Sequence, residues 1–410
     1  MSSAAASLPV PASAPQPPDA TSSFPSRSWL HQVVAATFAG LGARLSLVWI
    51  CFVGIVGVFA PMLANSHPFL IKIDGSWSSP MLQSFTPTDV TLLVGFVLTL
   101  VALRFRRISA AKRVAMVVGA IPITFLISYF TLHPPLTPTY EQYRKEARLG
   151  RVQWVLNAPV PYSPQDILTD EFSVDRPHPW APDRTHWAGT NSFGSDITSH
   201  LIHACRIAMA IGFIASAIEL VIGVVVGGLM GYFVGWVDLI GMRVVEVFSA
   251  IPTIYLLLAF VAVYGRDIYI IMIIIGVTGW VENARFVRAE FLKLRQQDFV
   301  YAAVASGLPL RSVIFRHILP NALAPLLVST SFGVASAILY ESTLSFLGLG
   351  IQIGEASWGQ LLNEAVSNGG GFYWWLAIFP GVAVFFTVLA YNLVGEAVRD
   401  ALDPKLQSRA

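Results

Sequence analysis

The stretch that decides the fold is IAMAIGFIASAIELVIGVVVGGLMGYFV, at positions 207–234. Glu219 is its only charged residue, and most of the others are apolar or small. A helix needs about 20 mainly apolar residues to cross the hydrocarbon core of a bilayer. We therefore predict that this stretch is a membrane-spanning helix.

The composition extends this prediction to the rest of the chain. Of its 410 residues 55% are hydrophobic and only 12% are charged, and the mean hydropathy is +0.63. A soluble domain would carry about 25% charged residues, so we predict an all-α polytopic membrane protein. A net charge of +2 gives no reason to expect a nucleic-acid partner. Seven further apolar stretches are candidate spans: 45–64, 89–103, 114–132, 244–264, 268–284, 321–349 and 374–395.

The basic residues of the connections indicate the orientation of these spans. Positive charge is concentrated in RFRRISAAKR (104–113), in 285–316 and at the C-terminus, whereas 65–88 contains only Lys72 and 350–373 has no basic residue. Short loops rich in Lys and Arg stay in the cytoplasm. Eight spans with both termini cytoplasmic satisfy this rule for each of these connections, which makes the long loop 133–206 extracytoplasmic.

The N-terminal residues do not resemble a folded segment. Residues 1–26 are rich in Ala, Ser and Pro, a composition that cannot bury a hydrophobic core. We predict a disordered cytoplasmic tail over 1–42. The two cysteines, Cys51 and Cys205, are too few for a disulfide framework.

Small residues recur at steps of four in the deciding stretch. Gly223, Gly227, Gly231 and Gly235 share this spacing, which in lipid allows a second helix to approach closely. Glu219 lies on the same ridge and should face the interior of the helix bundle. A carboxylate within the membrane either makes a structural hydrogen bond or lines a cavity that contacts substrate, and the sequence leaves both interpretations open.

The predicted cytoplasmic loop 285–320 contains an unusual segment, DFVYAAVASGLPLRSVIFRHILPN, at 298–321. Asp298 is placed to begin a short helix through Ala302 and Ala303, and Gly307 followed by proline is a helix stop. A second short helix carrying Arg311 would lead into the next span at Pro320. The loop is thus predicted to fold as a compact helical elbow whose alanines allow close approach to another surface.

The same segment resembles the EAA loop of ATP-binding-cassette (ABC) importer permeases through YAAVASG…HILPN. Other stretches resemble permeases of the dipeptide/oligopeptide type in the same order. They are HWAGTNSFGSDITSHLIHACRIAMAIG (186–212), GYFVGWVDLIGMRVVEVFSAIPTIYLLLAFV (231–261), GWVENARFVRAEFLKLRQQDFV (279–300), ESTLSFLGLGIQIGEASWG (341–359) and LAYNLVGEAVRDALDPKL (389–406).

This resemblance implies the transmembrane domain of a type I ABC importer in a bacterial cytoplasmic membrane. The chain would comprise a first core span plus two inserted spans (43–132), the outer loop 133–206, the permease core 207–396 and a cytoplasmic tail 397–410. The implied partners are ABC ATPase subunits, a second permease subunit and an extracytoplasmic solute-binding protein. The implied ATPase contacts lie on Asp298, Tyr301, Ala302, Ala303, Gly307 and Arg311.

The sequence departs from the family pattern at three positions. Tyr301 stands where the family usually has Glu, and Asn191 and Ser195 replace an Asp and an Arg in the segment before the core. None of the five lysines follows a glycine, so the chain has no GxxxxGK[ST] loop for ATP. ATP and Mg²⁺ are therefore expected on the partner ATPase, with no cofactor or metal in this chain.

Three alternatives compete with an ATP-driven peptide permease. An ion-coupled secondary transporter could use Glu219, with Glu246 as a second carboxylate. An ABC permease could carry a non-peptide cargo such as nickel. A membrane enzyme could bind a metal through His200 and His203, whose spacing allows it, although histidines near loops are more often packed or solvated.

Overall fold

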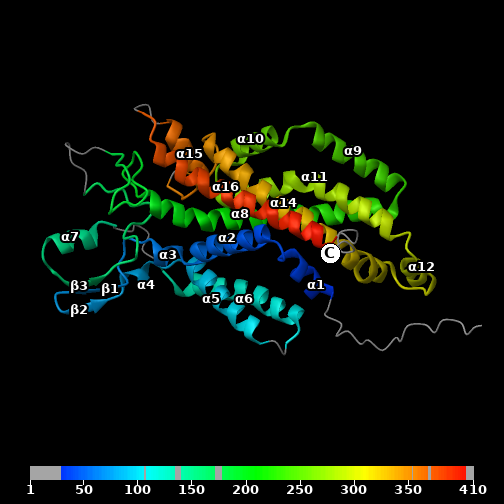
Figure 1. Ribbon diagram of the computed structural model, residues 1–410, viewed down its shortest axis with the longest axis horizontal. Coiled ribbons are helices and arrows are strands. Elements are labelled where there is room, and N and C mark those ends of the chain that lie inside the picture. Colours follow the sequence, from blue (N-terminus) through cyan, green and yellow to red (C-terminus); the bar gives the residue numbers. More distant parts are fainter. Residues whose placement is uncertain are drawn as a thin grey trace, which may run out of the picture.

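Helices form most of the chain and run largely along its long axis (Figure 1). The computed structural model describes residues 29–105, 108–133, 140–170, 178–352, 354–367 and 371–402. The helices preceding the core are α1 (Trp29–Thr37), α2 (Leu41–Val58), α3 (Ala60–Leu63), α4 (Pro80–Ser84), α5 (Pro87–Arg104), α6 (Ala110–Thr131) and α7 (Gln142–Arg148). The core helices are α8 (Ile197–Phe233), α9 (Trp236–Ala250), α10 (Thr253–Tyr264), α11 (Ile268–Leu294), α12 (Asp298–Ala305), α13 (Leu310–Ser312), α14 (Leu319–Phe346), α15 (Trp358–Ser367) and α16 (Trp374–Leu402).

Six helices of the described chain are long and apolar enough to cross a membrane: α2, α5, α6, α8, α11 and α16. Two bent pairs raise the number to eight if each pair is one span. The prediction of a polytopic helical membrane protein is confirmed, including the short stretch 89–103, which lies within α5. That helix begins with a capping box between Thr86 and Asp89, an arrangement that satisfies free backbone amides at a helix start.

The predicted span 207–234 is confirmed as a membrane-length helix, but the helix extends beyond it at the N-terminal end. Helix α8 begins at Ile197, where the Asp196 side chain accepts a hydrogen bond from the backbone amide of Ser199. The turns of α8 before residue 207 carry polar side chains that form hydrogen bonds with the N-terminal part of the chain. Arg206 pairs with Asp89 of α5 at 2.5 Å and donates from Nε to the Gly57 carbonyl at 3.1 Å. Hydropathy alone could not extend the helix through residues whose burial depends on distant partners.

The prediction of one unbroken span at 244–264 is also wrong. Helices α9 and α10 meet at an angle of 82°, and Ile251 between them is extended. Pro252 explains the break, because the residue before a proline is disfavoured in the helical conformation. The other bent pair, Leu310–Leu323 and Pro325–Phe346, has an angle of 61° and again breaks before a proline.

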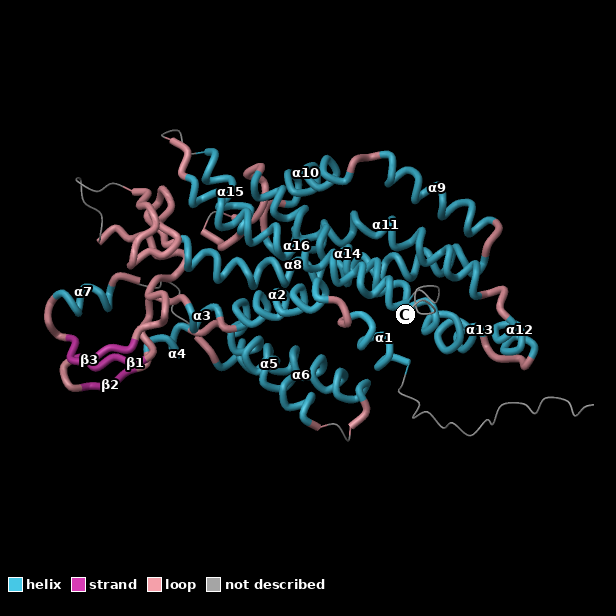
Figure 2. Tube along the Cα trace, viewed as in Figure 1, coloured by secondary structure: helices cyan, strands magenta, loops and turns pink. Residues whose placement is uncertain are grey.

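A three-stranded antiparallel sheet in the outer region departs from a purely helical fold. Its strands are β1 (Leu70–Ile73), β2 (Ser76–Ser78) and β3 (Val152–Leu156), in the order β2-β1-β3. Strand β1 precedes the α5–α6 hairpin and β3 follows it, so the hairpin leaves from and returns to the same end of the molecule (Figure 2). The sheet and α7 lie at the end opposite α12 (Figure 1).

The predicted disordered tail 1–42 is wrong for its last part. Residues 1–28 lie outside the described residues, but α1 and the start of α2 are helical. Thr37 of α1 is buried, with its hydroxyl donating to the Val33 carbonyl. The Ala, Ser and Pro bias ends near residue 26, and the apolar residues that follow support a helix.

The core helices pack around α8. Its Ile211 and Ala215 are fully buried in one cluster with Leu257 of α10, Ile275 of α11 and Leu344 of α14. A second buried cluster joins α11 to the connection that follows it, through Val287, Phe291, Val300, Ala303, Val313, Ile318, Ala322 and Leu326. Segment 298–318 is therefore anchored to the bundle rather than loosely attached.

Candidate functional site

Glycines on α8 bring α11 into backbone contact with it. A Cβ added at Gly223 would lie 2.5 Å from the Cβ of Asn283, and one at Gly231 would lie 2.6 Å from the Cβ of Phe291. At Gly227 the obstacle is the backbone carbonyl oxygen of Ala284. These three positions therefore have the close approach expected of a small-residue ridge in a membrane.

Gly235 does not belong to this ridge, contrary to the prediction. Helix α8 ends at Phe233, and both Val234 and Gly235 have positive φ angles. A Cβ added at Gly235 meets no atom within 4 Å. Its role is in the sharp turn between α8 and α9, where a glycine adopts the left-handed region without a steric penalty.

Glu219 occupies a niche made by glycines from two other helices. A side chain at Gly279 of α11 would collide with the Glu219 carboxylate, and a Cβ at Gly333 of α14 would lie 3.3 Å from it. Glu219 is only 5% exposed, and within the described residues its carboxylate makes no hydrogen bond or ion pair. The ridge thus brings α11 close while leaving the carboxyl group room at the helix junction.

Glu219 lines a polar cavity of about 530 Å³ between the helices α8, α9, α10, α11 and α14. Its wall includes Glu282 and Asn283 from α11 and hydroxyl or guanidinium side chains from the surrounding elements. These polar side chains are Ser249, Thr253, Thr278, Arg285, Ser329, Ser336 and Tyr340. Such a concave polar surface among membrane-length helices is suited to hold a polar solute.

The break between α9 and α10 forms part of the same wall. Ile251, Pro252 and Thr253 line the cavity, so the unwound backbone of the bent span faces it. Irregular backbone at membrane depth is tolerated where protein covers it or where it lines a water-filled cavity. Discontinuous helices at such positions are a recurrent feature of transporter binding sites.

The helical elbow predicted after residue 298 is present in the structure. Helix α12 starts at Asp298 and ends in a Schellman motif, in which the Leu308 amide donates to the Ala303 carbonyl at 3.2 Å and the Gly307 amide to Val304 at 3.0 Å. Gly307 has a φ angle of +75°, the left-handed conformation that this motif requires. The chain then continues through α13 and a π-helical turn (Val313–Ile318) into α14 without a loop.

The elbow has one face against the bundle and one exposed face. Ala303 is buried, whereas Asp298, Tyr301, Ala302, Gly307 and Arg311 are exposed. The exposed face, which we call the elbow surface, also contains large apolar side chains: Phe299, Val304, Leu308, Leu310 and Phe315. An exposed apolar patch of this kind indicates a contact with another protein or with lipid.

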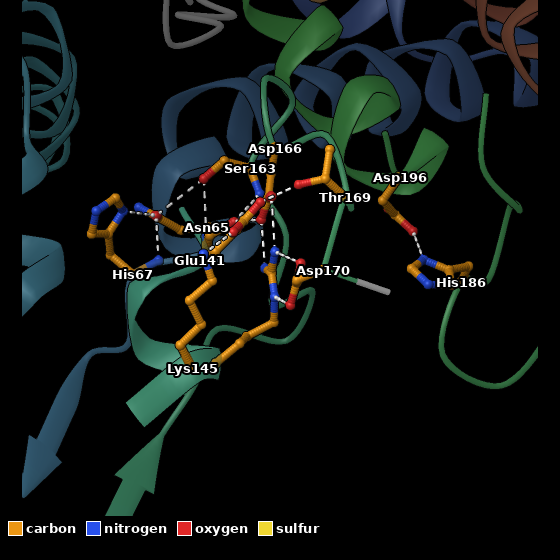
Figure 3. A network of polar contacts seen from close by, with 12 residues as sticks. Asn65, His67, Glu141, Lys145, Ser163, Asp166, Thr169, Asp170, His186 and Asp196 are labelled. Atoms are coloured by element: carbon orange, nitrogen blue, oxygen red, sulfur yellow. Dashed lines mark hydrogen bonds and ion pairs between the residues drawn. The ribbon is translucent and has the colours of Figure 1, made fainter. Parts of the chain in front are cut away.

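A polar network holds the outer region together (Figure 3). The guanidinium of Arg144 on α7 contacts Asp166 at 2.6 and 3.0 Å and Asp170 at 2.8 and 3.1 Å. Asp166 also accepts from the Ser66 hydroxyl at 2.5 Å. Burial would raise the pKa of Asp170, but the hydrogen bonds and charge of Arg144 hold it below its usual range.

This network predicts an acid-labile outer region. Because the folded pKa of Asp170 is lowered, its stabilising effect is present above the unfolded pKa of about 3.9 and is lost as the pH falls through the folded value. We expect the hydrogen-exchange protection of segment 142–170, measured relative to the intrinsic exchange rate at each pH, to decrease as the pH drops below about 4. Arg144→Met should give fast exchange already at pH 7. Lys145→Met, which removes an exposed pair with Glu141, should change little; equal protection in Arg144→Met and wild type would contradict this role.

The two histidines considered as metal ligands lie in the first turns of α8. The His203 ring nitrogen Nε2 is 2.9 Å from the Ala64 carbonyl oxygen, and His200 is buried. Across the described ranges no group of three or more His, Cys, Asp or Glu side chains is placed to hold a metal ion. The structure thus uses His203 to join α8 to the N-terminal region.

Three functional candidates were missed by the sequence analysis. Glu282 lines the same cavity as Glu219, but in the sequence it lies near the end of the predicted span 268–284. Glu341 is buried in α14 and accepts hydrogen bonds from Ser345 and Ser357, both at 2.7 Å. The position of Glu341 inside the apolar stretch 321–349 was the sequence signal that could have identified it. The Asp89–Arg206 pair had no such signal, because its partners are 117 residues apart.

Comparison with known proteins gives consistent matches. Residues 223–408 match the family described as "Binding-protein-dependent transport system inner membrane component". The inner membrane ABC transporter permease protein YejE of Escherichia coli is 32% identical over 84% of this chain and 87% of its own. The dipeptide permease DppC of Bacillus subtilis is 36% identical over 55% of this chain and 71% of its own. The oligopeptide permease OppC of Bacillus subtilis is 35% identical over 58% of this chain and 77% of its own.

Proposed function

Because this chain belongs to the family of binding-protein-dependent transport system inner membrane components, we propose that it is a permease subunit of an ATP-driven ABC importer for peptides. The observation that carries the proposal is the match to YejE, which extends over most of both chains. The cargo is inferred from the dipeptide and oligopeptide permeases that it resembles. These relatives support neither the ion-coupled transporter nor the nickel permease.

The elbow surface is proposed to dock on an ABC ATPase subunit. Its apolar side chains are exposed at one end of an elongated molecule (Figure 1), and Ala303 anchors the elbow from within. ATP and Mg²⁺ would bind to the ATPase. A movement of the ATPase would pass through α12 to α11 on one side and to α14 on the other, because both helices share a buried cluster with it.

Those two helices also form the wall of the 530 Å³ cavity. A rigid-body movement of α11 relative to α14 would therefore change the access to the cavity, which is the requirement for alternating access. A second permease subunit would complete the path, and an extracytoplasmic solute-binding protein would deliver the peptide. The sheet end is proposed to face outward, with α12 and both termini in the cytoplasm.

The proposal is tested with labelled trialanine in cells that carry or lack this chain. We expect ATP-dependent uptake that disappears with the chain and returns with its expression. Uptake should persist when the proton gradient is collapsed while ATP is maintained. Loss of uptake on collapse of the gradient alone would favour the ion-coupled alternative, and unchanged peptide uptake without the chain would exclude peptides as its cargo.

A further inference from the structure

The most unusual feature of the cavity is the unpartnered carboxylate of Glu219. It lies near the middle of the 37-residue helix α8, is 95% buried, and has neither a hydrogen bond nor an ion pair within the described part of the chain. An ionisable group inside a membrane is costly, and it is normally paired or marks a substrate or ion pathway. Among the described residues, the Glu219 carboxylate therefore has no cationic or hydrogen-bond-donating partner.

The surroundings preserve space for that partner. Gly279 and Gly333 remove the side chains that would otherwise fill the position beside the carboxylate. Asn283, Ser336 and Tyr340 line the same cavity, and their oxygens can accept hydrogen bonds, but within the described residues none of them donates to the Glu219 carboxylate. A buried carboxylate held only for packing would have its oxygens satisfied by such neighbours, as Glu341 does with Ser345 and Ser357.

A second acidic side chain in the cavity wall favours a positively charged ligand. Glu282 lines the same cavity as Glu219, and two carboxylates in one wall attract a cation. Arg285 is the basic side chain among the lining residues, and it donates to the Ser249 hydroxyl at 2.6 Å. It forms no ion pair within 4 Å with either carboxylate among the described residues, so the acidic pair is not neutralised.

We infer that Glu219 and Glu282 form a subsite for the terminal ammonium group of the transported peptide, an assignment that rests on the proposed function. A primary ammonium has three donors and no acceptor, which complements carboxylate oxygens flanked by amide and hydroxyl acceptors. The amino terminus of a peptide has a pKa near 7.7–8.0 and is largely charged at neutral pH. A resident metal ion would want more oxygen ligands than these two side chains give.

The test compares trialanine with N-acetyl-trialanine on the purified importer complex without its solute-binding protein. Saturation-transfer NMR measures the binding of each peptide directly. In the wild type, acetylation should weaken binding roughly tenfold, the size expected for loss of one charge-assisted hydrogen bond. Glu219→Gln should weaken trialanine binding to a similar degree while leaving N-acetyl-trialanine unchanged, and Glu219→Asp should retain the preference for the free amino group.

The matched control is Glu246→Gln. Glu246 lies on α9, is exposed and pairs with Arg243 at 2.5 Å, so its removal should leave both peptides unaffected. Equal binding of the two peptides in the wild type would overturn the subsite, and this comparison requires no variant. Equal weakening of both peptides in Glu219→Gln would overturn it as well, because it indicates a structural role. The proposed function fails separately, if the wild-type complex with ATP and binding protein does not take up trialanine.

Discussion

Replacing Gly227 with leucine should abolish peptide uptake and sharply reduce the yield of folded protein. A Cβ at this position would collide with the Ala284 carbonyl oxygen. The same added Cβ would lie only 2.8 Å from the Cβ of Val287. A backbone oxygen cannot rotate away as a flexible side chain can, so α8 and α11 would have to separate. We expect a loss of about 3 kcal/mol, the upper end of the range for overpacked cores.

The separation of these helices would also disturb the cavity, because Gly279 of α11 packs against Glu219 of α8. The measurement is the fraction of monodisperse protein after detergent extraction, together with trialanine uptake in the same cells. Gly119→Leu is the matched control, since Gly119 lies within helix α6 and a Cβ there meets nothing within 4 Å. Normal yield and uptake in Gly227→Leu would show that the ridge does not set the helix spacing.

Replacing Gly307 with valine should uncouple ATP hydrolysis from uptake. The residue has a φ angle of +75°, and a β-branched side chain in the left-handed region costs roughly 1–2 kcal/mol. The added Cβ meets no atom within 4 Å, so the effect comes from the backbone of the elbow and not from a clash. A change of this size lowers the ratio of ordered to disordered elbow about 5- to 30-fold, and uptake should fall as the ordered fraction falls.

ATP hydrolysis should continue in this variant if, as proposed, the ATPase sites lie on other subunits. Gly150→Val is the matched control: Gly150 has a φ angle of +73° and open space around it, but it lies in the outer region after α7. Gly307→Asn should be mild, since asparagine tolerates the left-handed region. Full uptake by Gly307→Val would remove the elbow from the coupling mechanism.

The sequence predicted the features that depend on local patterns. Apolar length located the spans, including the short one now seen as α5. The elbow was predictable because Gly307 and Pro309 act on their immediate neighbours, and α12 indeed ends before them. The ridge at Gly223 and Gly227 was predictable from its spacing, but Gly235 continued that spacing beyond the end of the helix.

The features that the sequence analysis did not predict depend on contacts between residues distant in the sequence. The first turns of α8 are polar, and they are helical because Arg206 meets Asp89 and His203 meets Ala64. The sheet pairs segments separated by two membrane-length helices, and its strands are too short to stand out in the sequence. The second carboxylate of the cavity was not found, because the cavity is assembled from helices that are far apart in the sequence.

The pairing of β1 with β3 also constrains how the protein is made. Strand β1 is synthesised first, and its partner emerges only after both helices of the hairpin α5–α6. The sheet can close only if that hairpin has entered the bilayer as a pair, since one helix alone would leave β3 on the wrong side. A mis-threaded chain would leave the central strand β1 without its partner β3, and a newly unpaired strand is the kind of surface that promotes aggregation.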